Sequence, residues 1–512
     1  QTCTAACKHV NATSPAVQWR KVLDMETGTY PDVRRVFVPV GCMHCADPPC
    51  MHVCPSTATG QRTDGIVTID YDLCIGCAYC AVACPYQARF KVQNPIFAYG
   101  KGRQMRNEIR REEPARIGVA QKCTWCVERI DFGLEHGLTP GVDPLATPAC
   151  VNSCIADALH FGNVEDADSN VSKLLRKSKS FTMHADLGTD PGFHYVYQDA
   201  SGEEAEDLRM EKVPGGLEVE GGVQPWRQRH WDWRAAGNFI CGGTGGGLAV
   251  MAGVAGYLGG PFAPLGLASL AFVALGLFFV FLETGRPLRA PLNVFFHPQT
   301  SWMTREAMIA VLLFATAAAA VRWDMKELAA LAALLGLFYV YSQGRILTEA
   351  KGIPAWREES VLPLFVATGM TEGAALFFLA AAVFPDLFGR LMPVATGQLL
   401  FLIVARFLAW MAYRRNLSRG APEGTLRAMA KANPWVLLAG HVLPLALLVA
   451  GPAYPAFIDG MDLLAGLLVV SFGWIMKYVI VIPGSYNQGF AIERAPGRGA
   501  GTSGPGVQPG WD

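Results

Sequence analysis

Two cysteine groups within residues 42–85 constrain this chain more than any other feature. They read Cys42-x2-Cys45-x4-Cys50-x3-Cys54-Pro55 and Cys74-x2-Cys77-x2-Cys80-x3-Cys84-Pro85. The second spacing is that of [4Fe–4S] ligation, in which three thiolates surround one cubane and the fourth, before a proline, binds the other cluster of a pair. The sequence therefore predicts paired cubane clusters near the start of the chain.

Two other uses of cysteine compete with this interpretation. C-x2-C pairs also form zinc sites, although two four-ligand runs that each close on Cys-Pro favour clusters. A disulfide framework suits small secreted domains, whereas here the cysteines are closely spaced and a large apolar remainder follows. Zinc is the more serious of the two alternatives.

Two further groups raise the expected number of clusters to four. Cys123-x2-Cys126 is completed after a 23-residue insert by Cys150-x3-Cys154, and the chain opens on Cys3-x3-Cys7. The opening pair has the spacing of the second half of a C-x2-C-x2-C-x3-C run. We therefore expect two more cysteines upstream of residue 1, in a natural chain that begins before it. The predicted ligands present here are Cys3, Cys7, Cys42, Cys45, Cys50, Cys54, Cys74, Cys77, Cys80, Cys84, Cys123, Cys126, Cys150 and Cys154.

Cysteines and apolar residues divide the chain into two regions. Fourteen of the 15 cysteines precede residue 155, and long apolar runs fill the part after residue 237. The expected fold is an α+β ferredoxin-like domain with several clusters, followed by an all-α membrane bundle of eight transmembrane helices. The expected segments are the cluster domain 1–200, a linker and interfacial segment 201–233, the bundle 234–485 and a tail 486–512. Cys241 and the glycines of 242–247 lie in an apolar run and predict helix packing.

Eight apolar segments are each close to the length that crosses a bilayer core. They are 237–258, 262–282, 302–321, 327–347, 361–383, 391–412, 434–450 and 461–482. An even number places both ends of this region on one side, together with the cluster domain. That side carries 16 Lys and Arg, against three in the opposite loops (Arg322, Lys326 and Arg390). The positive-inside rule therefore predicts a bacterial cytoplasmic-membrane protein whose cluster domain faces the cytoplasm.

The cysteine region resembles the four-cluster electron-transfer subunit of the dimethyl sulfoxide reductase family of molybdoenzymes. The resemblance covers residues 1–200 and rests on the order of the four groups, on Cys-Met-His-Cys-Ala-Asp-Pro-Pro-Cys at 42–50 and on Cys-Ile-Gly-Cys-Ala-Tyr-Cys at 74–80. It implies four [4Fe–4S] clusters, each with three cysteines from one group and one from a partner group. The implied sets are Cys42, Cys45, Cys50 with Cys84; Cys74, Cys77, Cys80 with Cys54; Cys123, Cys126, Cys150 with Cys7; and Cys3 with Cys154 and the two inferred cysteines. Some relatives lack the cysteine equivalent to Cys77 and carry a [3Fe–4S] centre, so a full cubane is expected here.

The apolar region resembles the membrane anchor subunit of the same family. The residues that carry this resemblance are Glu283-Thr-Gly-Arg286-Pro-Leu-Arg289-Ala, Ser301-Trp-Met-Thr-Arg305-Glu306 and Ile353-Pro-Ala-Trp356. It implies a quinol site on the cluster-facing side, with Glu283 where the family has a histidine and with Arg289 and Glu306 as further groups. The implied quinone is ubiquinone or menaquinone.

Ionisable residues near the expected helix ends indicate the same site. Such groups are costly inside a membrane and tend to be functional, and a quinone needs proton donors or acceptors for its two oxygens. The candidates expected at the cluster-facing ends are Glu283, Arg289, Glu306, Arg345 and His441. For Arg345, and for Lys477 at a similar position, snorkelling to the interface is the favoured alternative. Glu372 and Arg406 could pair inside the bundle.

The leading hypothesis is an electron-transfer and membrane-anchor subunit with no catalytic substrate site of its own. It would pass electrons between the membrane quinone pool and a separate molybdenum (bis-pterin) catalytic subunit. A cluster domain in the cytoplasm, fused to its anchor, resembles the sulfite-oxidising complexes, so a sulfite dehydrogenase that reduces quinone is favoured. The main rival is a quinol-oxidising reductase of dimethyl sulfoxide, polysulfide or tetrathionate. A third hypothesis, an ion pump energised by the clusters, requires charges buried mid-span in several helices. The formal net charge of zero gives no indication of a nucleic-acid partner.

Overall fold

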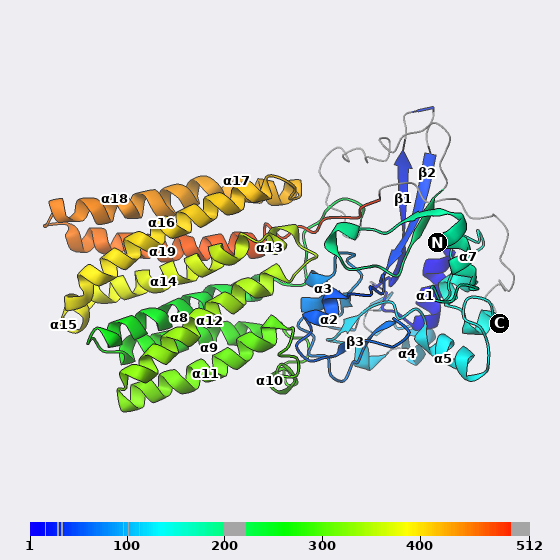
Figure 1. Ribbon diagram of the computed structural model, residues 1–512, viewed down its shortest axis with the longest axis horizontal. Helices are drawn as coiled ribbons and strands as arrows, with labels where there is room; N and C mark the ends of the chain where they lie inside the picture. Colours follow the sequence, from blue (N-terminus) through cyan, green and yellow to red (C-terminus); the bar gives the residue numbers. More distant parts are fainter. Residues whose placement is uncertain are drawn as a thin grey trace.

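The protein has two regions that lie end to end, an N-terminal region of short elements and a bundle of long helices (Figure 1). The structure is a computed structural model that describes residues 1–492 except 16, 28–29, 32–33, 96, 101, 112 and 198–221. Most of the linker expected at 201–233, with its acidic run, lies outside the described residues. The same is true of the tail after residue 492.

Among its described residues, the N-terminal region combines short helices with four two-stranded antiparallel sheets. The sheets pair β1 (Arg20–Thr27) with β2 (Arg34–Gly41), β3 (Thr59–Gln61) with β4 (Val67–Ile69), β5 (Phe90–Lys91) with β6 (Ala120–Gln121), and β7 (Lys179–Phe181) with β8 (Tyr195–Tyr197). The helices are α1 (Thr2–Asn11), α2 (Pro49–His52), α3 (Tyr79–Ala83), α4 (Arg106–Arg111), α5 (Val127–Glu135), α6 (Ala149–Asn152) and α7 (Asn170–Lys177). The expectation of a ferredoxin-like α+β domain is confirmed.

Eight helices of the second region are long and apolar enough to cross a membrane, as expected from the sequence. They are α8 (Trp233–Tyr257), α9 (Ala263–Glu283), α11 (Trp302–Trp323), α12 (Lys326–Thr348), α14 (Val361–Val383), α16 (Met392–Leu417), the continuous stretch of α17 (Glu423–Leu437) and α18 (Leu443–Ala450), and α19 (Ile458–Val481). Short helices α10 (Ala290–Asn293), α13 (Pro354–Arg357) and α15 (Pro385–Phe388) occupy connections. The largest boundary error concerns the seventh span, which begins at Glu423 rather than 434.

Helix α8 lies at the centre of the bundle and is the most deeply buried of the eight. Its glycines allow neighbouring backbones to approach, since a methyl group at Gly246 would lie 2.9 Å from the carbonyl oxygen of Gly336 on α12. Close approach of this kind stabilises helix packing in lipid. The glycine run is therefore a packing feature, as expected.

The two regions are joined by hydrogen bonds between polar side chains and backbone carbonyls. The Tyr79 hydroxyl on α3 donates to the carbonyl of Ile346 on α12 at 2.7 Å. The Trp231 indole, just before α8, donates to the carbonyl of Cys77 at 3.0 Å. In Figure 1, α2 and α3 lie beside the bundle and α1 lies at the far end of the N-terminal region. The Cys77 loop is therefore held directly against the helices.

Candidate functional site

Three of the four cysteine groups share a local structure, whereas Cys3 and Cys7 of the first group both lie within α1. The third cysteine of a group lies in a short helix, as Cys50 does in α2 and Cys80 in α3, and the fourth follows as the helix ends. Ending the helix at Cys-Pro turns the fourth thiol away from the first three. Backbone N–H groups of Thr59, Trp125 and Ala158 donate to cysteine sulfurs at 3.3–3.5 Å. This local geometry produces the exchange of ligands between groups that the sequence predicts.

The structure brings the predicted ligand sets together. Cys45 has Cys42, Cys84 and Cys50 as its charged neighbours. Cys77 likewise has Cys80, Cys54 and Cys74 around it, and Cys123 has Cys150 and Cys7. The Asn11 amide lies 3.7 Å from the sulfurs of both Cys7 and Cys126, which places Cys126 in the same set. Cys3 faces Cys150 and Cys154.

The four sets follow one another in a line through the N-terminal region. Cys3 neighbours Cys150 of the next set, and Cys123 of that set neighbours Cys42. Cys50 in turn neighbours Cys80, whose set includes Cys77 at the bundle. The line thus runs from α1, at the far end of the region, to the helices.

Buried cations separate these thiols from one another. Arg89 donates to the Cys50 sulfur at 2.9 Å and to Thr59 at 3.0 Å. Arg20 and Lys122 are also buried, with exposures of 3% and 1%. Among the described residues, the Nε atom of Arg89 and two guanidinium nitrogens of Arg20 have no hydrogen-bond partner. Buried cations require nearby negative charge, which thiolates bound to iron would supply.

Without such iron, the thiols would remain protonated. Burial raises the pKa of Cys84 to about 12, and the neighbouring thiols of Cys50 and Cys42 raise it further. Burial likewise raises the pKa of Cys80 to about 11, against the opposing effect of Arg89. A metal deprotonates its thiol ligands and offsets this cost. The site therefore fits a cofactor of positive metal ions held by thiolates.

A zinc ion and a cubane make different demands on the positions of the sulfurs. Within the part of the chain that the structure describes, no three His, Cys, Asp or Glu side chains converge closely enough to hold one metal ion. A zinc site needs four ligands at about 2.3 Å from one centre, whereas a cubane spreads its thiolates over four irons.

Replacing Arg89 by methionine should lower the reduction potential of the clusters on either side of it. A reduced cluster carries one more negative charge, which the buried guanidinium and its hydrogen bond to Cys50 stabilise. Potentiometric titration followed by electron paramagnetic resonance measures the shift. The exposed Arg35→Met serves as the control, and equal potentials in the two variants would contradict the assignment.

A cavity of about 480 Å³ lies in the bundle beside the last cysteine set. Cys77 and Trp231 line its end at the N-terminal region, and α8, α9 and α11 supply most of its apolar wall. The lining residues Phe281 (37% exposed) and Val311 (56% exposed) place its opening on the outer surface of the helices. A membrane-soluble molecule could therefore enter it from lipid.

Four buried polar side chains line this apolar cavity; the Thr284 hydroxyl donates to the carbonyl of Phe281, and the other three are Asn238, Glu283 and Glu306. The exposures of these three are 5%, 5% and 4%. In the described part of the chain, one oxygen of each of the three lacks a hydrogen-bond partner. Such unpaired buried atoms are costly unless a ligand or water satisfies them. The cavity can therefore bind a molecule that is mostly apolar and carries a few hydrogen-bonding atoms.

Of the five residues proposed for this site from the sequence, Glu283 and Glu306 line the cavity and three do not. Arg289 donates to the carbonyl of Tyr71 at 2.7 Å, at the junction of the two regions. Arg345 bonds to Glu349 at 2.5 Å. Both arginines serve contacts at the helix ends instead.

His441 is the clearest misplacement. His441 lies near the middle of the seventh span, in a π-helix (Leu438–Val442), and not at a cluster-facing end. Its Nδ1 lies 2.9 Å from the carbonyl of Val436 and its Nε2 accepts from Arg406 at 3.2 Å. The snorkelling interpretation of Lys477 is also wrong, because its side chain is 1% exposed and pairs with Glu372. Arg406 and Glu372 do lie inside the bundle.

The sequence interpretation missed three residues of the cavity region. Trp231 was expected only as part of an interface belt, and Asn238 and Lys91 were not singled out. Lys91 donates to the carbonyls of Glu283 and Gly76, each at 3.2 Å. Burial lowers its pKa, and the Glu283 charge opposes that effect. A polar residue in an apolar run was the one signal that could have identified Asn238.

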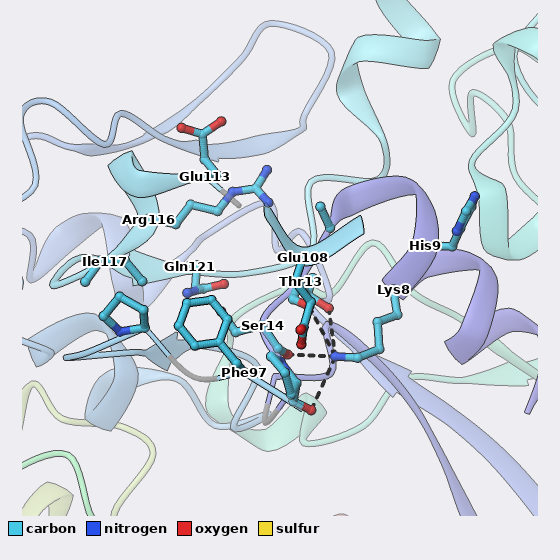
Figure 2. Close-up of a pocket in the computed structure, with 13 residues that line it drawn as sticks. Lys8, His9, Thr13, Ser14, Phe97, Glu108, Glu113, Arg116, Ile117 and Gln121 are labelled. Atoms are coloured by element: carbon cyan, nitrogen blue, oxygen red, sulfur yellow. Dashed lines mark hydrogen bonds between the residues drawn. The ribbon is translucent and has the colours of Figure 1, made fainter. Parts of the chain in front are cut away.

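A smaller cavity of about 160 Å³ lies in the N-terminal region, away from the bundle (Figure 2). The Lys8 ammonium that lines it donates to the backbone carbonyls of Ser14, Val17 and Pro15 at 2.6–3.3 Å. Arg116 donates to the carbonyl of Asn11 at 2.5 Å. Lys8 and Arg116 therefore hold the segment after α1 in place. This structural role accounts for the polar residues that line the smaller cavity, without a ligand.

Comparisons with known proteins agree with the cysteine geometry. The family model described as a 4Fe–4S dicluster domain matches residues 33–98. The B subunit of selenate reductase from Mesobacillus selenatarsenatis is 36% identical over 38% of this chain and 66% of its own length. The corresponding subunit of sulfite dehydrogenase from Allochromatium vinosum is 37% identical over 35% of this chain and 63% of its own. The B subunit of tetrathionate reductase from Salmonella typhimurium is 34% identical over 39% of this chain and 68% of its own length. This chain thus spans about two thirds of the length of these curated relatives.

Proposed function

Because the chain belongs to the family of iron–sulfur subunits of molybdoenzyme reductases, we propose that it conducts electrons between a molybdenum catalytic subunit and membrane quinone. The single observation that carries this proposal is the apolar cavity, which adjoins Cys77 and contains two buried carboxyl groups. A quinone is apolar except for two ring oxygens, and its reduction takes two electrons and two protons. The cavity offers room for the ring, a neighbouring cluster and proton-exchanging groups.

The cysteine sets support a conduction path of four [4Fe–4S] clusters. Clusters held by these thiolates accept and donate single electrons. The set of Cys3 and Cys154 stands at the outer end, where Cys154 is partly exposed. The set of Cys77 stands at the cavity. The catalytic subunit would dock at the outer end and the quinone would bind at the inner end.

The carboxyl groups of the cavity provide its acid–base chemistry. Glu283 ends α9, where Lys91 and Asp232 of the cluster side lie around it. Glu306 lies on α11, facing α12. Each can hold a proton beside a quinone oxygen, and the two sit on different walls of the cavity. Glu283 and Glu306 are therefore the proposed quinone-binding residues of this chain.

The most specific form of the proposal is sulfite oxidation coupled to quinone reduction. It rests on the predicted cytoplasmic side of the cluster domain and on its continuity with the helices in one chain. A quinol-oxidising reductase uses the same clusters and cavity in the opposite direction. The direction of net electron flow in the purified complex distinguishes these two hypotheses. Electrons pass from sulfite to quinone in the first and leave quinol in the second.

Filling the cavity should block quinone chemistry without disturbing the clusters. Ala307 lines the cavity, whereas the next residue, Met308, does not and is 43% exposed on the outside of the same helix. We expect Ala307→Trp to slow the quinone-driven reoxidation of dithionite-reduced clusters by about a hundredfold, as loss of positioning does in other enzymes. Ferricyanide, which takes electrons without protons, should still oxidise them. Met308→Trp should match the unaltered protein, and equal slowing by both would contradict the site.

A further inference from the structure

A row of buried polar groups leads from the cavity into the bundle. The Glu306 carboxylate lies against the Tyr339 hydroxyl and the Gln343 amide of α12. Tyr339 is 0% and Gln343 1% exposed. Within the described residues, one oxygen on each of the three lacks a hydrogen bond of good geometry. The row therefore has unused hydrogen-bonding capacity although it is removed from water.

Helix α8 leaves a gap through which this row continues. A methyl group added at Gly243 would collide with the Lys477 ammonium of α19 and would lie 3.1 Å from the Gln343 carbonyl oxygen. Lys477 and Gln343 thus flank the same glycine from two different helices. The bare backbone at position 243 allows them to face each other.

Beyond the gap lies a buried ion pair. Lys477 donates to Glu372 of α14 at 2.6 Å, with side-chain exposures of 1% and 0%. Thr244 donates to the same carboxylate oxygen at 2.8 Å, and Trp474 donates to the Thr244 hydroxyl at 3.0 Å. The second Glu372 oxygen lacks a partner among the residues described. This carboxylate is only partly satisfied.

A second cation adjoins the pair. A methyl group at Gly473 would lie 2.7 Å from the free Glu372 oxygen and 3.1 Å from an Arg406 nitrogen. Arg406 also donates to the Gly440 carbonyl at 2.7 Å and to His441 Nε2 at 3.2 Å. His441 Nδ1 faces a carbonyl oxygen, which can only accept, so this histidine is neutral with its proton on Nδ1.

The charges in this row do not balance by themselves. Lys477 and Arg406 are two cations, while Glu372 is one carboxylate, and buried charge is costly unless it is compensated. The nearest further carboxylate along the row is Glu306 at the cavity. Ionisation of Glu306 would make the set of four neutral. Cys241 also lies near Lys477 and Glu372, as a thiol.

We propose that Glu306, Tyr339, Gln343 and the Lys477–Glu372 pair form an internal proton path that serves the cavity. This inference rests on the proposed quinone site and adds the route by which one proton reaches it. Along this path, the Lys477 ammonium gives one proton to the Glu306 carboxylate. The products are a neutral Lys477 amine and a Glu306 carboxylic acid, and the reverse transfer restores the two charged groups. Glu306 can then pass that proton to a quinone oxygen, and the site recovers it from the cluster side by way of Asp232 and Glu283.

The Gly243→Ala substitution tests the path without removing any charged group. Its methyl group enters the space between Gln343 and Lys477. Gly256→Ala, on the same helix, is the matched control because its nearest neighbour lies 3.4 Å away. We expect Gly243→Ala to slow quinone-driven reoxidation of reduced clusters by about tenfold or more, as loss of a proton-transfer group does. The affinity for quinone and the rate with ferricyanide should stay unchanged.

The double variant Glu372→Gln/Lys477→Met separates a proton path from a structural ion pair. Removing one partner of a buried pair destabilises a protein, whereas removing both is often tolerated. We therefore expect both single variants to melt at lower temperature and the double variant to recover. The double variant should nevertheless transfer electrons to quinone slowly. Its infrared difference spectrum between oxidised and reduced complex should lose a carboxyl band that the unaltered complex shows.

Two outcomes would overturn the proton path. One is a double variant that reduces quinone at the unaltered rate with an unchanged infrared spectrum. The other is equal slowing by Gly243→Ala and Gly256→Ala. Either outcome leaves the quinone site intact if Ala307→Trp still blocks the reaction. If Ala307→Trp has no effect on the reaction with quinone, the quinone site itself is contradicted, and with it the proposed function.

Discussion

A Cys77→Ser chain should assemble in the membrane with three clusters unchanged and should exchange electrons with quinone about a hundredfold more slowly, a difference of about 2.7 kcal/mol in barrier. Cys77 is the cysteine that lines the cavity, and its carbonyl accepts from Trp231 at the junction of the two regions. Loss of this thiolate leaves one corner of the adjacent cubane without its ligand. We expect that cluster to lose iron and to convert to a [3Fe–4S] centre, which changes its potential at the point where electrons enter or leave.

The control for this substitution is Cys241→Ser. Cys241 is buried in α8, outside all four ligand sets. Iron content, paramagnetic spectra and the rate of cluster oxidation by quinone should all stay unchanged in this variant. If Cys77→Ser retained its full iron content and its quinone reaction, the cluster beside the cavity would not be the one held by Cys77.

The ligands within one cysteine group could be predicted because ligand spacing is a local property, whereas the pairing of the groups was implied by the resemblance to the molybdoenzyme family. A C-x2-C-x2-C-x3-C run fixes which thiols can reach one cluster, whatever the rest of the chain does. The exchange of the fourth ligand depends on the helix end at Cys54 and Cys84, which the following proline encodes. The eight helices were predictable for a similar reason, because length and hydropathy determine whether a segment can span a bilayer.

The cavity was only half predictable, because its walls come from helices far apart in sequence. Glu283 and Glu306 were found since acidic residues near spans stand out, but Asn238 in the cavity wall and Tyr339 behind Glu306 resemble ordinary packing residues. His441 was misplaced although the expected span 434–450 already held it near the middle, so the error lay in its assignment to a helix end. Pairing of Lys477 with Glu372 depends on the gap at Gly243, which no single segment reveals.

The same gap bears on the hypothesis of an ion pump. That hypothesis required charges buried mid-span in several helices, and the bundle contains Glu372, Arg406 and Lys477 on three different helices. In the described residues, however, the row joins these groups to the cavity and extends as far as His441. Charges arranged in this way favour proton supply to a quinone, which the substitutions at Gly243 and in the ion pair test directly.

Glu306→Gln should abolish quinone reduction while the clusters remain fully reducible by dithionite. The amide has almost the same shape as the carboxyl group, so the cavity and the packing of α11 should persist. It cannot release or accept the proton that a quinone oxygen requires, and general acid–base groups contribute about a hundredfold or more to rate. The measurement is again the reoxidation of reduced clusters by quinone, with ferricyanide as the proton-independent oxidant.

Glu327→Gln provides the matched control, because Glu327 is an exposed carboxylate in the first turn of α12. It should react with quinone at the unaltered rate. Glu283→Gln should retain the first turnover, since Glu306 keeps its own connection through Gln343, but should slow the following ones, because Glu283 lies on the route that replaces the proton. The double variant should retain neither. If Glu306→Gln slowed ferricyanide and quinone equally, the residue would support assembly of the neighbouring cluster rather than proton transfer. A selective loss with quinone, by contrast, would support proton exchange at Glu306, in the cavity beside Cys77.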